Sequence, residues 1–306
     1  MNPLLSICIP TYNRVNTLKQ SLERLTSLQV FKESDELEIV ISDNASSDGT
    51  EQFCRQLTTR FPEKIKYFRN DTNVRDENFH LALLRGKGDF LKLANDTLLF
   101  ENTGICTMLQ SIREHQQDKP VLYFRNLDTN DAPELCTSFD SFISSVGFMA
   151  TWIAEFGIWR SDFEQLTDFA RARDLQLIQA DVMFRIVAQK QRALVVRRKF
   201  FSQIHLPSLG GYSAAIVFGQ NYHNLLRPYV QSGLVSAKTL AKDKWLVFRY
   251  PILGNYLITS PRFKFTKSDY ITSLWPEYKG TWYYWFFMPF ALAAIPISRI
   301  RRLINR

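Results

Sequence analysis

LLSICIPTYNR at residues 4–14 and LEIVISDNASSDGT at residues 37–50 are two apolar runs, and each ends in polar side chains that can form hydrogen bonds. Between them, Leu18, Leu22, Leu25 and Leu28 recur at the spacing of an amphipathic helix. This order predicts a strand, a helix and a second strand parallel to the first. Parallel sheets carry binding groups at the carboxyl ends of their strands, so the polar residues after each run are the first candidates for a site.

The chain continues to alternate between strand and helix patterns as far as residue 126, and the pattern is less regular from there to residue 198. We expect further strands at residues 65–69, 89–94, 121–126, 152–160 and 193–198, and helices at 51–60 (capped by Thr50), 78–84, 102–116, 162–170 and 181–190. The alternation predicts an α/β fold with a mostly parallel sheet covered by helices. From about residue 215 we expect mostly helix, with boundaries at Pro228, Pro251, Pro261 and Pro276.

The charge is distributed unevenly along the 306 residues. Residues 1–189 hold 20 Lys+Arg against 27 Asp+Glu, whereas residues 190–306 hold 18 against 3. A basic C-terminal third predicts contact with an anionic partner, either a membrane surface or nucleic acid; a basic face kept for solubility is the simpler alternative. The four cysteines are scattered, which favours free thiols in a reducing compartment, and the first residues show no signal-peptide pattern.

The two opening motifs together resemble the start of family 2 glycosyltransferases. The resemblance covers about residues 4–210 and implies a GT-A type nucleotide-diphospho-sugar transferase fold. It implies a catalytic domain at residues 1–212, followed by a basic, aromatic, helical region at 213–306. The implied activity is inverting transfer of a hexosyl or deoxyhexosyl group. We expect the acceptor to be a lipid-linked glycan, such as a bacterial O-antigen or capsule repeat on a polyprenyl diphosphate.

The resemblance also implies a set of residues for the nucleotide-sugar. In the family the Asp that matches Asp43 binds the nucleoside, and the second motif usually reads Asp-Asp-Gly-Ser-x-Asp-Gly-Thr. For Asp48-Gly49-Thr50 we favour a turn and a helix cap. A later Asn-x-Gly landmark has Arg75 in place of Gly, and Arg75 either reaches a phosphate or lies on a solvated loop. The full predicted set is Pro10, Thr11, Tyr12, Arg14, Asp43, Asn73, Arg75, Asn78, Asn95 and Asp96, and Asn13 lies within its first segment.

The fourth predicted strand leads into the position of the family's Asp-x-Asp site, which holds a divalent cation against the sugar diphosphate. Asp96 matches the second Asp, but Ala94 stands at the first. Either Asp96 suffices for Mn²⁺ or Mg²⁺ with water and phosphate oxygens, helped by Asn95, or metal dependence is weak. The resemblance further implies that His205 approaches the metal or diphosphate, and Gly210-Gly211 would allow a mobile lid.

Inverting transfer needs a carboxylate that takes the proton of the acceptor hydroxyl. In the family this base opens a helix, and Asp181 fits that position, with Asp162 as the second choice. The alternative for Asp181 is a carboxylate that only stabilises the helix N-terminus. Trp152 and Trp159 either stack on a sugar or pack in the core.

Residues 282–297 are uncharged and mostly apolar, and Arg299, Arg301, Arg302 and Arg306 follow them. The run is short for a membrane span and contains two prolines. We therefore predict peripheral attachment of 282–306 at the cytoplasmic face of the bacterial inner membrane, or else a helix packed on the catalytic domain.

Two other classes of protein remain open from the sequence. A nucleotidyltransferase would normally carry a glycine-rich loop after its first strand, which residues 10–14 lack. A non-enzymatic membrane- or nucleic-acid-binding protein would explain the charge but not the three aspartates. We expect no nucleic-acid partner.

Overall fold

The computed structural model describes residues 3–169, 171–204, 213–254, 270–287 and 289, and its centre is a parallel sheet. The five strands lie in the order β3-β2-β1-β4-β8, and only β8 is antiparallel to its neighbour. Their bounds are β1 Leu5–Thr11, β2 Leu37–Asp43, β3 Ile65–Arg69, β4 Phe90–Leu93 and β8 Gly157–Trp159. The predicted α/β class is therefore confirmed.

Two smaller sheets extend this centre. The first has the order β6-β9-β7, and the second pairs β10 with β5. In the first, β6 and β9 run parallel, and their ranges agree with the predicted strands. The bounds are β5 Leu98–Phe100, β6 Val121–Asn126, β7 Glu134–Cys136, β9 Ala193–Arg198 and β10 Phe201–Gln203. The three-residue strands β5, β7 and β10 are too short to give a periodic signal, and we did not expect them.

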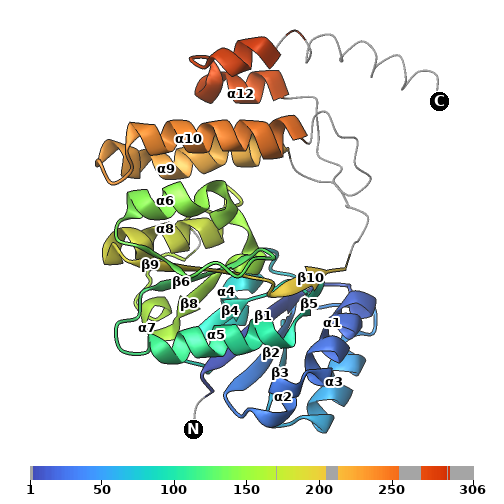
Figure 1. Ribbon diagram of the computed structural model, residues 1–306. Helices are drawn as coiled ribbons and strands as arrows, with labels where there is room; N and C mark the ends of the chain where they lie inside the picture. Colours follow the sequence, from blue (N-terminus) through green and yellow to red (C-terminus); the bar gives the residue numbers. More distant parts are fainter. Residues whose placement is uncertain (1–2, 170, 205–212, 255–269, 288, 290–306) are drawn as a thin grey trace, which may run out of the picture.

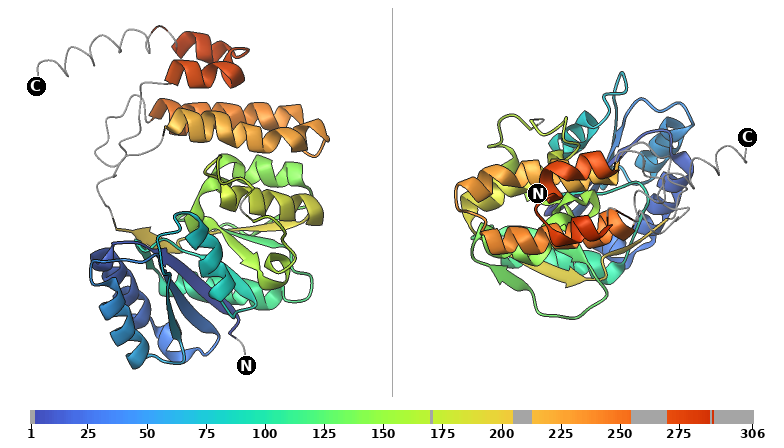
Figure 2. Two further views of the ribbon diagram at one scale, coloured as in Figure 1. Left: turned by 180° about the vertical axis from the view of Figure 1, so that it is seen from behind. Right: turned by 90° about the horizontal axis from the view of Figure 1, so that it is seen from above.

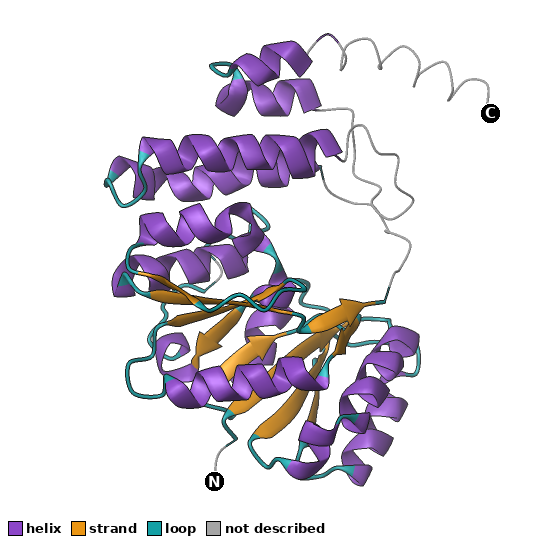
Figure 3. Ribbon diagram, in the orientation of Figure 1, coloured by secondary structure: helices purple, strands orange, loops and turns teal. Residues whose placement is uncertain are grey.

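Helices cover both faces of the central sheet (Figures 1 and 3). Helix α1 buries Leu18, Leu22 and Leu25 against it, as their spacing predicts. The helices of this part are α1 Val15–Ser27, α2 Gln29–Glu33, α3 Thr50–Arg60, α4 Glu77–Arg85, α5 Asn102–Glu114, α6 Phe139–Val146, α7 Arg160–Phe163 and α8 Ile178–Lys190.

The predictions for residues 152–170 were only partly right. The expected strand is shortened to β8 and follows a 3-10 turn, η2 (Ile153–Glu155), and the expected helix is only the four-residue α7. The buried Lys92 of β4 holds this turn, because its Nζ donates to the carbonyls of Ala154 at 2.6 Å and Phe156 at 2.9 Å. The sequence shows only a lysine within an apolar strand, and this does not predict a contact with residues 154 and 156.

The C-terminal part forms further helical layers above α6 and α8 (Figures 1 and 2). It consists of the π-helical segments η3 Ala215–Asn221 and η4 Phe248–Gly254, and the helices α9 Tyr222–Gln231, α10 Ala237–Val247 and α12 Tyr270–Tyr278. Pro228, Pro251 and Pro276 lie inside these helices, so they are not the boundaries that we expected. Each proline removes one backbone hydrogen bond, and packing of the buried faces offsets that loss. Pro261 lies outside the described residues.

One apolar core joins the two parts of the chain. Tyr123, Phe142 and Phe184 belong to the same buried cluster as Tyr222 and Tyr278. The 3-10 segment η1 (Gly147–Thr151) lies at the junction, where Oδ1 of Asp243 on α10 accepts the backbone N–H of Phe148 at 3.1 Å. Gly147 has a φ of +56°, and a Cβ there would collide with the Asp243 carboxylate. The boundary between residues 212 and 213 stays a prediction.

Stability should respond to pH through Asp243, which is 2% exposed. Burial raises the pKa of its carboxyl from 3.8 to about 6. The folded state therefore holds this proton more tightly than the unfolded state, and stability falls as pH rises through 6. Asp243→Asn keeps an oxygen for Phe148 but cannot ionise. Relative to the variant, wild type should lose about 1.4 kcal/mol of unfolding free energy between pH 5 and 7.5.

Urea unfolding of both proteins at the two pH values measures this effect. The difference between the proteins cancels the contributions of the other titrating groups. Parallel pH profiles of wild type and Asp243→Asn would contradict the prediction.

Within the described part of the chain, every helix is too short or too polar to cross a lipid bilayer.

Candidate functional site

The carboxyl ends of β1 and β4 meet at Asp96. Thr11, the last residue of β1, donates from Oγ1 to Asp96 Oδ2 at 2.8 Å. Arg14, which directly precedes α1, donates from Nη1 to Asp96 Oδ1 at 3.1 Å. The strand register also sets Thr11 beside Asp43 at the end of β2. Four of the predicted donor-side residues are thus brought to one edge of the sheet.

The Asp96 carboxylate is almost enclosed, with 4% of its side chain exposed. Burial raises its pKa, and the charge of Arg14 and the hydrogen bond from Thr11 oppose that rise. Arg14 has 41% of its side chain exposed, so its guanidinium spans the distance between the buried carboxylate and solvent. The pair places a cation where an anionic ligand could reach it.

The oxygen atoms near Asp96 suit a hard divalent cation. Oδ1 of Asn95 is buried and has no hydrogen-bond partner among the described residues. Mg²⁺ and Mn²⁺ prefer such oxygens and commonly take only one or two protein carboxylates, with substrate phosphates as further ligands. Ala94 packs in the apolar cluster and adds no ligand. No group of three or more His, Cys, Asp or Glu gathers anywhere in the described ranges, and His205 and Gly210-Gly211 lie outside them.

Asp43 is completely buried at the end of β2. Its Oδ1 accepts the backbone N–H of Ser46 at 2.9 Å, and its Oδ2 accepts the hydroxyl of Tyr67 at 2.7 Å. Arg69 Nε lies 4.0 Å from Oδ2. Asp43 therefore fixes the conformation of the loop after β2. Sequence reasoning missed Tyr67 and Arg69, although both lie on β3, which agrees with the strand that we expected at residues 65–69.

A group of amide side chains fixes the neighbouring loops. Asn44 donates from Nδ2 to Asn73 Oδ1 at 2.7 Å, and its own Oδ1 accepts from Asn70 at 3.0 Å. Asn78 is buried, and its Oδ1 accepts from Ser42 Oγ at 2.6 Å. Asn73 and Asn78 thus fix the loops around the end of β2. Their predicted part in donor binding stays a prediction.

The turn prediction for Asp48-Gly49-Thr50 is confirmed, but Thr50 is not the cap. Helix α3 begins at Thr50, and Gly49 precedes it with a φ of +92°. The Asp48 carboxylate accepts the Thr50 hydroxyl at 2.6 Å and also the backbone N–H of Val15 at 2.9 Å. Asp48 therefore ties the loop after β2 to the start of α1.

Two residues that replace family glycines keep a left-handed backbone. Ala45 has a φ of +63° and Arg75 a φ of +53°. Left-handed backbone costs a residue with a Cβ more than it costs glycine, since the Cβ approaches the following carbonyl. Glycine would therefore suit the backbone at both positions better than the residue present.

We expect Ala45→Gly and Arg75→Gly each to raise the free energy of unfolding by about 0.5–1 kcal/mol. Urea unfolding measures the change. Ala241→Gly is the matched control, because Ala241 is exposed inside α10 and should lose about 1 kcal/mol. A loss of stability in both loop variants would contradict the prediction. Arg75→Gly also separates the two interpretations of Arg75, because only a phosphate contact would weaken nucleotide binding.

Asp181 lies in the first turn of α8 and is fully buried. Arg171 contacts its Oδ1 from Nη2 at 2.7 Å, and Arg185 Nε lies 3.1 Å from Oδ2. The neighbouring Arg173 pairs with Glu77 at the start of α4 at 3.2 Å. The segment that covers Asp181 is thereby joined to α4, whose Asn78 contacts the β2 end. Asp181 forms its hydrogen bonds and ion pairs with Arg171 and Arg185, and the described residues show none from it to Asp43 or Asp96.

The remaining predicted residues have clear positions. Asp162, the second choice for the base, pairs with Lys190 at 2.6 Å. Trp159 is a core residue whose Nε1 donates to the carbonyl of Pro120 at 2.7 Å. Trp152 is partly buried and packs against Phe201. Pro10 lies within β1, and Tyr12 is 45% exposed beyond its end.

Comparison with protein families places the N-terminal part of the chain. Residues 6–134 match the model of Glycosyl transferase family 2. Abequosyltransferase RfbV of Salmonella typhimurium is 35% identical over 38% of this chain and 34% of its own length. The GalNAc(5)-diNAcBac-PP-undecaprenol beta-1,3-glucosyltransferase of Campylobacter jejuni is 30% identical over 37% and 35%. The chain thus aligns with about a third of the length of these relatives.

Solved structures extend the likeness over more of the chain. Mannosyltransferase PcManGT from Pyrobaculum calidifontis, in complex with GDP-Man and Mn²⁺, has a TM-score of 0.58 at 16% identity, over 100% of this chain and 84% of that one. TarS 1–349 of S. aureus, in complex with UDP-GlcNAc, has a TM-score of 0.57 at 17% identity, over 89% and 79%. These likenesses show the fold, and they confirm the predicted GT-A type.

Proposed function

We propose that the chain is an inverting glycosyltransferase, because residues 6–134 match the model of Glycosyl transferase family 2. It moves a hexosyl or deoxyhexosyl group from a nucleotide-diphospho-sugar to a lipid-linked glycan in bacterial surface polysaccharide synthesis. The observation that carries the proposal is the meeting of Thr11, Arg14 and Asp96 at the carboxyl edge of β1 and β4. Ligands of open α/β sheets bind at that edge.

The donor lies across this edge. Asp43 holds the loop that receives the nucleoside, and exposed Tyr12 and Arg14 lie beside it. Arg14 donates to the sugar diphosphate from the N–H groups that Asp96 does not use. Asp96 and Asn95 would hold a divalent cation, which when bound neutralises charge on the departing diphosphate. Two solved relatives in fold bind GDP-Man with Mn²⁺ and UDP-GlcNAc, which supports a donor of this class.

Asp181 is the base. It takes the proton of the acceptor hydroxyl as that oxygen bonds to the anomeric carbon, and the bond from that carbon to the diphosphate breaks with its electron pair on the leaving group. Arg171 occupies the carboxylate in the free protein. Its side chain is 46% exposed, so it can turn outward when the hydroxyl enters.

The lipid-linked acceptor draws support from the Campylobacter relative, whose name contains PP-undecaprenol. The C-terminal helices add a surface suited to a bilayer. Trp282 is 72% exposed, Trp285 52% and Phe286 69%, whereas Tyr284 and Phe287 of the same segment are buried. Exposed aromatic rings favour the headgroup region of a membrane. The protein therefore works as a peripheral protein at the cytoplasmic face of the inner membrane.

A binding and hydrolysis panel tests the enzyme. UDP-, GDP-, dTDP- and CDP-sugars are offered to the full chain with and without Mn²⁺, and binding is measured by calorimetry. At least one should bind and be slowly hydrolysed. If no nucleotide sugar binds or turns over, the proposal is wrong.

The triple variant Trp282→Ser, Trp285→Ser, Phe286→Ser should release the protein from vesicles of phosphatidylglycerol and phosphatidylethanolamine. Each inserted side chain contributes on the order of 1 kcal/mol, so the partition coefficient should fall roughly 100-fold. Vesicle sedimentation measures it, and Leu84→Ser, at an exposed leucine of α4, is the control. Substitution is preferable to deletion of 282–306, because deletion would also remove Tyr284 and Phe287 from the core. Unchanged sedimentation would refute attachment.

A further inference from the structure

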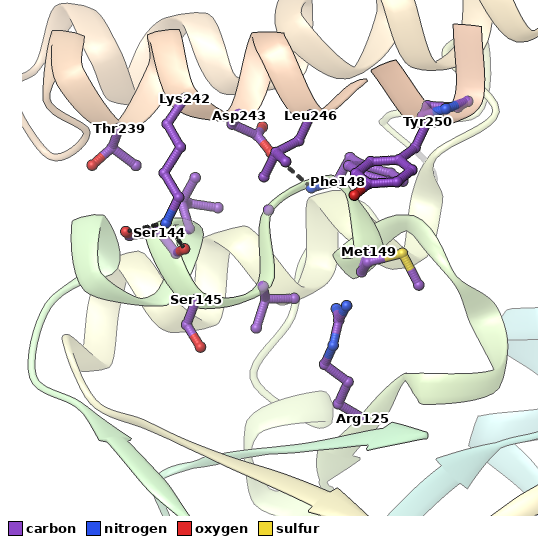
Figure 4. Close-up of a pocket in the computed structure, with 14 residues that line it drawn as sticks. Arg125, Ser144, Ser145, Phe148, Met149, Thr239, Lys242, Asp243, Leu246 and Tyr250 are labelled. Atoms are coloured by element: carbon purple, nitrogen blue, oxygen red, sulfur yellow. Dashed lines mark hydrogen bonds between the residues drawn. The ribbon is translucent and has the colours of Figure 1, made fainter. Parts of the chain in front are cut away.

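A pocket of about 510 Å³ lies where the C-terminal helices meet the catalytic fold (Figure 4). Its walls come from η1 and the end of α6 on one side and from α10 and η4 on the other, and Arg125 of β6 forms its base. Its volume is within the range of small-molecule sites. None of the residues predicted for donor binding or for the base lines it.

Arg125 brings an unused donor to this pocket. Nη1 of its guanidinium is buried and has no hydrogen-bond partner among the described residues. Glu155 supplies the nearby negative charge, but its oxygens are taken by the hydroxyl of Tyr123 at 2.6 Å and the backbone N–H of Asn126 at 2.9 Å. A buried cationic donor without a hydrogen-bond partner destabilises the folded state, so its position indicates where a bound anion would be stabilised.

A second cation enters from the opposite wall. Lys242 of α10 donates from Nζ to the carbonyl of Ser144 at 3.0 Å and to its hydroxyl at 3.3 Å (Figure 4). An ammonium group has three N–H bonds, so one remains for a ligand. Ser145 adds a hydroxyl close by. The two cations therefore belong to elements far apart in the sequence and converge on one space.

Thr239 and the buried Asp243 also line the pocket, and Oδ1 of Asp243 accepts the backbone N–H of Phe148. Much of the remaining lining is apolar or aromatic. Leu246 and Pro251 face the pocket, and Tyr250, which is 54% exposed, stands at its rim. η4 belongs to the same cluster of helices that carries the exposed aromatic surface of residues 282–286. An anion-binding base with an apolar wall fits a molecule that has a phosphate group joined to a hydrocarbon.

We propose that this pocket receives the diphosphate end of the lipid-linked acceptor, with Arg125 and Lys242 as its donors and Leu246, Tyr250 and Pro251 against the first isoprene units. This inference rests on the proposed function. It gives the C-terminal helices a direct part in acceptor recognition, whereas the donor stays at the Asp96 edge.

Equilibrium binding of farnesyl diphosphate to the full chain tests the proposal without requiring turnover. Lys242→Gln and Arg125→Gln should each weaken binding about tenfold, as expected for the loss of one charge-assisted hydrogen bond. Lys238→Gln is the matched control, because Lys238 lies one turn earlier on α10 and does not line the pocket. Arg14→Gln controls for binding at the donor edge. Lys242 is exposed, so its variant should fold even if Arg125→Gln is destabilised by the charge left on Glu155.

The outcomes separate the sources of the anion. Weaker binding in Lys242→Gln with wild-type binding in Lys238→Gln and Arg14→Gln supports the proposal, as does weaker binding of inorganic pyrophosphate and of farnesol. Unchanged binding in Lys242→Gln, a loss in Arg14→Gln instead, or equal affinity for inorganic pyrophosphate would overturn it. Nucleotide-sugar binding by the same proteins reports on the proposed function separately. It should be unaffected in Lys242→Gln, and its absence from wild type would refute the glycosyltransferase itself.

Discussion

Asp181→Asn abolishes sugar transfer, with kcat about 1,000-fold lower, while the affinity for the nucleotide-sugar stays within a factor of about two. The amide cannot accept the proton of the acceptor hydroxyl, and the ion pairs of Asp181 are with Arg171 and Arg185 rather than with the residues at the donor edge. Steady-state kinetics with the donor found in the binding panel, together with calorimetry, measure both quantities.

The substitution also removes the charge that holds Arg171 and Arg185, so folding must be checked by circular dichroism and thermal unfolding. Arg173→Gln is the matched control, because it breaks the neighbouring ion pair with Glu77 but leaves Asp181 intact. If Asp181→Asn loses donor affinity as well as turnover, Asp181 is not the base.

Asp96→Asn lowers kcat/KM about 100-fold or more and also weakens donor binding. Asp181→Asn differs in that donor binding is kept. The substitution of Asp96 leaves Arg14 without its counter-charge and removes the carboxylate that we propose as the cation ligand. Activity measured against Mn²⁺ concentration distinguishes these effects. If the variant needs more Mn²⁺ for half-maximal activity, Asp96 is a metal ligand. If the rate falls but the Mn²⁺ requirement stays the same, Asp96 acts by positioning Arg14.

Asp89→Asn provides the control for Asp96. Asp89 is exposed at the amino end of the same strand, so the change removes an equal charge at the edge that carries no predicted ligand. Normal donor binding in Asp96→Asn would show that the donor edge has been assigned wrongly.

The fold was predictable from sequence where strands were buried and long. The apolar runs of β1, β2, β6 and β9 are near-continuous, because both faces of these strands are covered. The turn at residues 153–155 was not predictable, since it depends on Lys92, sixty residues away in the chain. The prolines gave wrong helix boundaries for a similar reason. Tertiary packing of α9 and α12 outweighs the loss of one backbone hydrogen bond at Pro228 and at Pro276.

The candidate site was predictable at its strand ends but not in its contacts. Motif spacing brought Thr11, Asp43 and Asp96 to one edge, because parallel strands end together. Spacing says nothing about partners, so Tyr67 beneath Asp43 and Arg171 over Asp181 became visible only in three dimensions. No sequence motif predicted the pocket that has Arg125 at its base, because its lining comes from three separated stretches of the chain.

The common interior of the two parts limits how this protein can be re-engineered. A chimera that grafts another relative's C-terminal half onto residue 212 would strip the partners from Phe142 and Phe184 and leave Gly147 facing a foreign helix. Acceptor preference is therefore better redesigned by exchanging α6 and η1 together with the helices above them, as a single transplanted block.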